Sequence, residues 1–260
     1  RNVLVLDHAK QAGKKILISG GGRCNFTNMD VEPNNYLCGN PHFVKSALSR
    51  YTQWDFLGLI AKYNVAYHER DFGQLFCDES AKEIVRILMS ECQASGARVQ
   101  LRTEISELTK SCDDERYMVK TNQGDYQSES LVIASGGLSM PKLGATPFGY
   151  KVAEQFGLEV LPTRAGLVPF TLHEHDKEKY ADLSGISLPC RVESSDNTSF
   201  MADMLFTHRG LSGPVILQIS NYWLAGEAVS IDLLPSLDLA TELDNQRQNH
   251  PNQSVKNTLS

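Results

Sequence analysis

The stretch of this sequence best suited to chemistry contains three consecutive glycines. It runs Lys15-Ile16-Leu17-Ile18-Ser19-Gly20-Gly21-Gly22-Arg23-Cys24-Asn25. Without Cβ atoms, a glycine backbone can adopt positive φ angles and come close to a ligand. Successive N–H groups in such a loop form a concave anion site, and Arg23 adds a planar positive group. A plain turn is the alternative, but Ser19 before the glycines and Arg23, Cys24 and Asn25 after them favour a pyrophosphate site.

Cys24 is the candidate for a redox thiol, because a positive neighbour such as Arg23 stabilises a thiolate. The alternative is a small packed residue. We favour packing, since no cysteine nearby in the sequence could resolve a disulfide with Cys24. We assign no catalytic acid or base, and the dispersed histidines lead us to expect no metal site.

A second glycine site is predicted near the middle of the chain. The apolar run Leu131–Ala134 predicts a buried strand, and Ser135, Gly136 and Gly137 follow it at once. A buried strand that ends in paired glycines is typical of a place where backbone approaches a cofactor. Ala134, Ser135, Gly136 and Gly137 therefore join the candidate binding residues.

An acidic residue follows the first apolar run. Val3–Leu6 predicts a buried parallel strand, and Asp7 comes directly after it. An acid at the end of the second strand of a dinucleotide-binding unit bonds the ribose hydroxyls. The alternative is that Asp7 only caps the next turn.

The remaining elements are predicted from periodicity and from turn residues. We expect a helix over 41–63, a hairpin or two short strands over 64–76, a helix from Ser80 to Ala94 with a Ser80–Glu83 capping box, a strand over 98–108, a hairpin over 117–128 and a helix over 149–156. From about residue 161 the sequence has short alternating runs that predict mainly β-strands. The predicted domains are therefore 1–161, an α/β dinucleotide-binding domain, and 162–260, a β-rich domain that leads into a helical part.

Composition narrows the functional class. The 260 residues carry a net charge of -6, and the pI is near 5.7, so we expect no nucleic-acid partner. No apolar run approaches the roughly 20 residues that span a bilayer, so no membrane association is expected. Six scattered cysteines without a C-x-x-C pair indicate reduced thiols and a cytoplasmic protein. The oligomeric state is left open.

Four blocks in order resemble one family, the BaiN-type NAD(P)/FAD-dependent oxidoreductases, also called aminoacetone-oxidase-like FAD-binding flavoproteins. The blocks are Gly13–Asn28, Leu131–Lys142, Ala165–Phe170 and Leu205–Ser220. The resemblance implies an α/β fold, a Rossmann-like FAD-binding domain of the glutathione-reductase type with an inserted β-rich domain. The family begins with a strand and a G-x-G-x-x-G turn and ends with a second FAD segment. Neither is present here, so we expect the chain to be incomplete at both termini.

The resemblance also assigns roles. Asp7 stands where the family places an acid, usually glutamate, on the adenosine ribose, and Ile105 would touch adenine through its backbone. The first glycine loop, together with Lys15 and Ser19, would line the pyrophosphate and flavin, and 134–137 would form the second turn. FAD is the implied cofactor, with NADH or NADPH as electron donor and a small molecule as substrate.

Three functions remain open. The first is hydride transfer between a reduced nicotinamide or organic substrate and flavin. The second is a non-catalytic fragment that does not hold FAD. The third is an RNA-modifying flavoprotein, against which the acidic pI and the lack of a basic stripe count.

Overall fold

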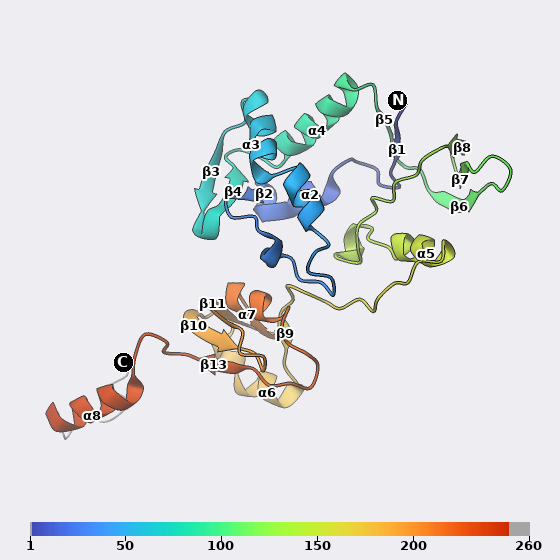
Figure 1. Ribbon diagram of the computed structural model, residues 1–260. Coiled ribbons are helices and arrows are strands. Elements are labelled where there is room, and N and C mark those ends of the chain that lie inside the picture. The colour runs from blue at the N-terminus through green and yellow to red at the C-terminus, as the bar shows by residue number, and fades with distance from the viewer. Residues whose placement is uncertain (1, 250–260) are drawn as a thin grey trace. The chain divides into compact units, whose positions relative to one another are not determined.

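The computed structural model describes residues 2–249, and the chain divides into two compact units, Arg1–Leu161 and Pro162–Ser260 (Figure 1). In the first unit the elements are β1 (Leu4–Leu6), α1 (Lys14–Ile18), β2 (Asn25–Asn28), α2 (Lys45–Arg50), α3 (Gln53–Lys62), β3 (Tyr67–Arg70), β4 (Gln74–Cys77), α4 (Lys82–Ala94), β5 (Arg98–Gln100), β6 (Ile105–Lys110), β7 (Tyr117–Thr121), β8 (Gly124–Ser128) and α5 (Phe148–Gln155). In the second they are β9 (Phe170–Thr171), α6 (Glu174–Lys179), β10 (Ser187–Glu193), β11 (Ser199–Thr207), β12 (Gly210–Ser212), α7 (Pro214–Ile219), β13 (Ser230–Asp232) and α8 (Leu239–Asn249). Residues 250–260 of the predicted second domain lie outside the described part. Within residues 2–249, no helix is long and apolar enough to cross a bilayer.

Three small sheets build the first unit. β1 and β5 pair in parallel, with Leu4 opposite Arg98. The other two sheets are antiparallel, in the strand orders β2-β4-β3 and β6-β7-β8. A core beneath the first of these contains Ile60 of α3, Cys77 of β4 and Ile87 of α4, each 0% exposed. Both predicted hairpins are confirmed, because β3 pairs with β4 and β7 pairs with β8.

The helix expected over 41–63 is instead two helices, α2 and α3. The chain is extended at Tyr51, and Thr52 begins α3 as its N-cap. The Thr52 hydroxyl accepts the Asp55 N–H at 3.2 Å, and the Asp55 carboxylate accepts the Thr52 N–H at 2.7 Å. This reciprocal cap ends the helical run, because the N-cap residue has non-helical backbone angles.

The strand expected over 98–108 is also divided. β5 ends at Gln100 and β6 begins at Ile105, and between them Arg102 has a φ of 56°. The two halves join different sheets, β5 pairing with β1 and β6 with β7. The positive φ at Arg102 turns the backbone between the two pairings, so the run is two strands and not one.

Two expectations about buried strands are wrong. Leu131–Ala134 is irregular, and the Val132 side chain is 84% exposed. A strand needs a hydrogen-bonded neighbour, and no strand in residues 2–249 pairs with this segment. β1 has the predicted parallel pairing, but it pairs only with β5 and its Val5 is exposed.

Helix α4 forms where expected, but its cap differs. The N-cap residue is Ala81, and Ser80 accepts the Lys82 N–H at 3.2 Å through its hydroxyl. Glu83 bonds Arg86 at 2.8 Å instead of closing a capping box. Helix α5 confirms the helix predicted over 149–156 to within one residue at each end.

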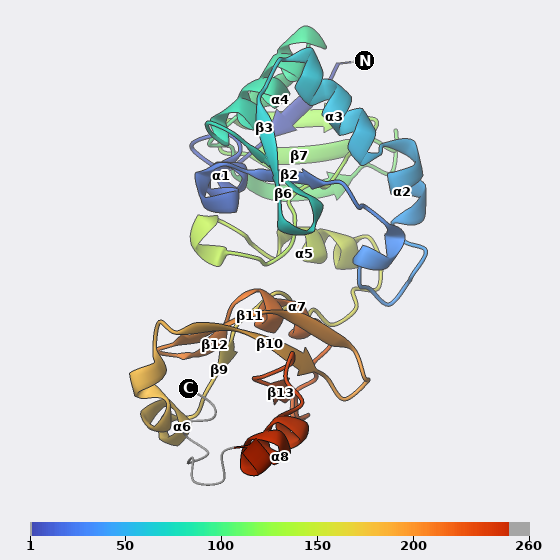
Figure 2. The ribbon, with the colours of Figure 1, turned by 90° about the vertical axis from the view of Figure 1, so that its left-hand side faces the viewer.

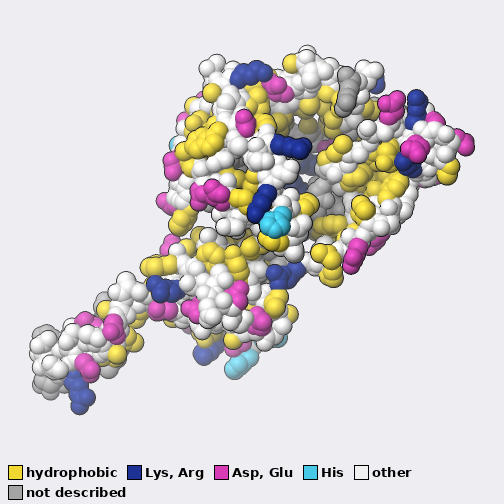
Figure 3. Space-filling view, viewed as in Figure 1, with side chains coloured by type: hydrophobic (Ala, Val, Ile, Leu, Met, Phe, Trp, Pro, Cys, Tyr) yellow, Lys and Arg dark blue, Asp and Glu magenta, His cyan; other side chains and the backbone are white. Residues whose placement is uncertain are grey.

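The second unit is a five-stranded antiparallel sheet covered by α7. The strand order is β13-β10-β11-β12-β9. Val215, Ile216 and Ile219 of α7 are fully buried against Val192 of β10 and Met204 of β11. α8 carries charged side chains of both signs on the face seen in Figure 3. The mixed α/β and β-rich architecture of the prediction is therefore confirmed.

Candidate functional site

The first glycine loop is a tight turn whose glycines have different tasks. Helix α1 leads into a 3-10 turn over Ser19–Gly22, where the φ angles of Gly20, Gly21 and Gly22 are 55°, 67° and 88°. A Cβ on Gly20 would lie 2.7 Å from a ring carbon of Phe76, whereas a Cβ on Gly21 would meet nothing within 4 Å. Gly20 therefore allows the loop to pack on β4. Gly21 leaves its outer surface open to a ligand.

Main-chain hydrogen bonds fix this loop to the elements beneath it. The Ala81 N–H donates to the Gly22 carbonyl at 2.7 Å, and the Cys77 N–H donates to the Arg23 carbonyl at 2.9 Å. The Arg23 side chain is exposed and makes no ion pair with any residue that the structure describes. The loop thus holds its backbone in one conformation and presents a guanidinium to solvent.

Cys24 belongs to the core below the loop. Its side chain is 5% exposed, and it packs in the cluster that contains Cys77 and Ile60. Burial raises the pKa of the Cys77 thiol to about 11. The burial of Cys24 favours the packing alternative over a reactive thiol.

Lys15 connects the two predicted glycine loops, which lie far apart in the sequence. Its ammonium donates to the Ser139 hydroxyl at 3.2 Å, across 124 residues. The same nitrogen lies 4.0 Å from the position that a Cβ on Gly136 would take, and Gly136 has a φ of 72°. The segment 134–136 is exposed and irregular. The structure therefore brings Lys15 and the second glycine turn together, although the strand expected before that turn is absent.

Asp7 lies at the end of β1 and is fixed through its backbone. Its N–H donates to the Gln100 carbonyl and its carbonyl accepts the Thr103 N–H, both at 3.0 Å. One carboxylate oxygen, Oδ1, accepts the Ala9 N–H at 2.8 Å, as in the turn-capping alternative. The other, Oδ2, has no hydrogen-bond partner in residues 2–249, and 39% of the side chain is exposed. Asp7 can thus cap the turn and still offer one oxygen to a hydroxyl group.

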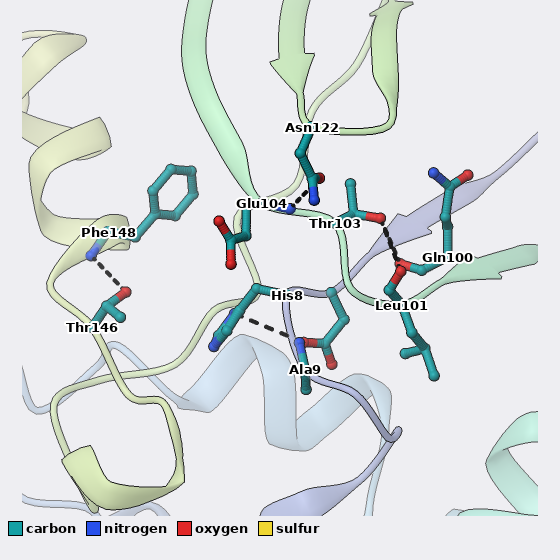
Figure 4. A network of polar contacts seen from close by, with 10 residues as sticks. His8, Ala9, Gln100, Leu101, Thr103, Glu104, Asn122, Thr146 and Phe148 are labelled. Atoms are coloured by element: carbon teal, nitrogen blue, oxygen red, sulfur yellow. Dashed lines mark hydrogen bonds and ion pairs between the residues drawn. The ribbon is translucent and has the colours of Figure 1, made fainter.

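Ile105 begins β6, two residues beyond Thr103. It pairs with Thr121 in the ladder, and its side chain packs on Leu108 and Val119. The preceding bend is fixed by Asn122, whose amide oxygen accepts the Glu104 N–H at 2.8 Å (Figure 4). The amide nitrogen of Asn122 donates to the Arg102 carbonyl at 3.1 Å. Asp7 and Ile105 are therefore connected through the segment between β5 and β6, which is hydrogen-bonded to Asp7 at Thr103.

Two features of the site were not predicted from the sequence. His8 lies against the loop after the second glycine turn, where a Cβ on Gly144 would be 2.8 Å from its Nε2. The stretch 8–29 contains no Asp or Glu but includes Lys10, Lys14, Lys15 and Arg23. This local run of positive charge was available in the sequence as a signal for an anionic ligand.

The sequence matches two models of one protein family. Residues 1–210 match the family model described as HI0933-like protein Rossmann domain, and residues 164–260 match HI0933-like protein barrel and H2TH domain. These matches confirm the predicted Rossmann-like fold with a second β-rich domain.

Three curated relatives are similar to the chain. It is 56% identical over its whole length to the ribosomal RNA dihydrouridine synthase of Escherichia coli K12, and 53% identical to the protein of that name from Haemophilus influenzae Rd. It spans 64% and 65% of the length of these two relatives. The 3-dehydro-bile acid delta(4,6)-reductase of Clostridium scindens is 23% identical over 91% of the chain and 59% of its own length.

These relatives correct one expectation and confirm another. The names of the first two state an action on ribosomal RNA, which contradicts our expectation of no nucleic-acid partner. That expectation rested on the net charge of the whole chain, which does not show how charge is distributed locally. The resemblance found in the four sequence blocks is confirmed. The chain belongs to the HI0933-like family of flavoproteins, which includes the BaiN-type enzymes.

Proposed function

We propose that this chain is the FAD-holding part of a flavin-dependent reductase that converts uridine in ribosomal RNA to dihydrouridine. The observation that carries the proposal is the 56% and 53% identity, over the whole chain, to two ribosomal RNA dihydrouridine synthases. These relatives favour the RNA-modifying alternative over a small-molecule substrate. The name of the Clostridium scindens relative also describes a reductase, which supports the broader class of reaction.

The chemistry requires a hydride and a proton. The C5=C6 bond of uracil is conjugated with the C4 carbonyl, so hydride adds at C6 and a proton at C5, which leaves the saturated ring. Reduced FAD supplies the hydride when it is bound, and NADH or NADPH restores the reduced form. The task of this chain is to hold the cofactor and to bring the base to it.

The described residues are suited to hold FAD at three places. The pyrophosphate would lie on the open side of Gly21 and Gly22, next to the exposed Arg23 guanidinium. The oxygen of Asp7 that has no partner would accept a ribose hydroxyl, and the backbone at Ile105 would contact adenine. Lys15, Ser19, Asn25 and the turn 134–137 would complete the cofactor contacts.

The test measures cofactor and product separately. We expect the purified full-length protein to show a flavin absorption band after desalting. With FAD and NADPH or NADH, it should form dihydrouridine in ribosomal RNA transcribed in vitro, detected by nucleoside mass spectrometry. Bound flavin without dihydrouridine in any ribosomal transcript would overturn the RNA assignment. A protein that takes up no FAD would overturn the cofactor assignment.

A further inference from the structure

A groove of about 420 Å³ lies beside β2 in the first unit, separate from the glycine turn but continuous with it in sequence. Asn25, the last residue of the first glycine stretch, lines it together with Tyr36, Tyr51 and Gln53. Figures 1 and 2 both show α2 and α3 beside β2, and these elements form the walls. None of the lining side chains is charged.

The aromatic residues of the groove divide into a fixed base and an exposed rim. Phe26 and Phe56 contact each other with ring centroids 6.0 Å apart, and both pack on the core below. Tyr36 and Tyr51 are 45% and 54% exposed. Exposed aromatic rings over a rigid base are what unpaired nucleic-acid bases stack on.

The charge around the groove suits a phosphate backbone. No Asp or Glu occurs from Pro33 to Trp54, although the chain as a whole has 31 such residues and a net charge of -6. Lys45 and Arg50 lie on α2 within this stretch, both exposed. Neither is in an ion pair among the residues that the structure describes. Asp30, Glu32 and Asp55 stand just outside this stretch, and the Asp55 carboxylate is occupied by the Thr52 cap. Lys45 and Arg50 lie on α2, whose Leu48 lines the groove, so they are the cations available to phosphates near the stacking rings.

One amide in the groove is available to a base edge. Asn28 has both ends of its amide occupied, by the Phe72 carbonyl at 2.9 Å and the Asp30 N–H at 2.8 Å. Within residues 2–249, the Asn25 amide has no hydrogen-bond partner. A carboxamide offers one donor and one acceptor, which complement the carbonyl and the adjacent N3–H of uracil.

From these observations we propose that the groove binds an unpaired nucleotide of the RNA substrate. Its base stacks on Tyr36 or Tyr51, Lys45 and Arg50 contact its phosphates, and the exposed Asn25 amide contacts the base edge. The inference rests on the proposed function, because it supplies the binding surface for that RNA. Asn25 follows Arg23 and Cys24 in the chain, so the groove begins two residues after the stretch that is proposed to hold the flavin.

The test compares rim variants with a matched control outside the groove. Tyr36→Ala and Tyr51→Ala remove one stacking ring each, and Tyr51→Phe keeps the ring. The control is Phe72→Ala, since Phe72 is 71% exposed but does not line the groove. The flavin-loaded full-length protein is titrated with fluorescein-labelled single-stranded oligouridine, and anisotropy reports the dissociation constant. A thermal melt and the flavin content show that each variant is folded.

We expect each alanine variant to weaken oligouridine binding about tenfold, with Tyr51→Phe and Phe72→Ala close to wild type. Wild-type affinity in both tyrosine variants would overturn the inference and leave the proposed function intact, because the RNA would bind elsewhere. Equal losses in Phe72→Ala would also overturn it, as the effect would not belong to the groove. If the wild-type protein binds neither oligouridine nor ribosomal transcripts, the proposed function fails as well.

Discussion

The two glycine turns of the first unit have similar sequences but are held in different ways. The turn at 19–22 rests on a core, where the Gly22 carbonyl accepts the Ala81 N–H and the carbonyl of the next residue, Arg23, accepts the Cys77 N–H. The turn at 134–137 is exposed and irregular, and the ammonium of Lys15 bonds the hydroxyl of Ser139 close to it. Glycines thus permit a turn in both places. The first turn is held by a buried core, whereas the second meets single side chains such as Tyr150, whose hydroxyl lies 2.9 Å from the position of a Cβ on Gly137.

The largest effect should come from adding one methyl group to the packed turn. Gly20→Ala places a Cβ 2.7 Å from the Phe76 ring at a φ of 55°, so overpacking and backbone strain act together. We expect the free energy of unfolding to fall by about 2–5 kcal/mol. Urea unfolding of Gly20→Ala and Gly21→Ala measures the difference, because the second variant has strain without a clash. Equal losses in the two variants would show that the packing below Gly20 is unimportant.

A second variant removes the side-chain contact between the two turns and leaves every glycine in place. Lys15→Met removes the hydrogen bond to Ser139 and a positive charge from the proposed cofactor site. We expect FAD affinity to fall about tenfold, in the range of one charge-assisted contact, with little change in stability. Lys14→Met is the matched control, since Lys14 is exposed on the same helix and carries the same charge. Fluorescence titration with FAD gives both constants, and an equal loss in Lys14→Met would indicate a general charge effect.

The exposed turn should tolerate a methyl group better than the packed one. In Gly136→Ala the nearest atom to the new Cβ is the Lys15 nitrogen at 4.0 Å, so only the positive φ opposes the change. We expect a loss of about 1 kcal/mol in the free energy of unfolding. A loss as large as that of Gly20→Ala, measured in the same urea series, would mean that the second turn is as constrained as the first.

The last prediction concerns how the stability of the core under the packed turn depends on alkaline pH. The pKa of Cys77 is raised to about 11 from 9.0 by burial, so the folded protein keeps this proton when the unfolded chain has lost it. The resulting penalty for the thiolate is absent below pH 9 and grows as the pH rises toward 11. Urea midpoints across this range should fall more steeply for the wild type than for Cys77→Ala. Cys92→Ala, at a partly exposed site on α4, should follow the wild type.

Local signals predicted most elements of the first unit, and the misses have physical causes. Hairpins and α4 depend on turn residues and on periodicity, which are properties of the sequence itself. The apolar run at 131–134 has the composition of a strand, but a strand exists only with a partner, and no local pattern supplies one. The Thr52–Asp55 cap was visible in the sequence and was outweighed by the helical spacing around it.

The candidate site was predictable as residue types but not as an arrangement. The glycines, Arg23 and Asp7 could be chosen from the sequence, whereas the contact from Lys15 to Ser139 depends on tertiary structure. The sequence analysis did not lead to the proposed RNA partner, because a net charge of -6 conceals acid-free stretches at 8–29 and 33–54. Counting charged residues in short segments of the sequence would have shown these stretches.

The parallel pairing of β1 with β5 has a consequence for the timing of synthesis. The partners of Leu4–Asp7 lie roughly ninety residues later in the chain, so this end of the site cannot form until Gln100 has left the ribosome. At about 5–20 residues per second, the apolar segment waits for about 5–20 s without its neighbour. During that interval Val3–Leu6 lacks its ladder with β5, so this edge of a β-prone segment is open to other chains. Slow translation or delayed release over residues 90–105 should therefore promote aggregation more than delay later in the chain.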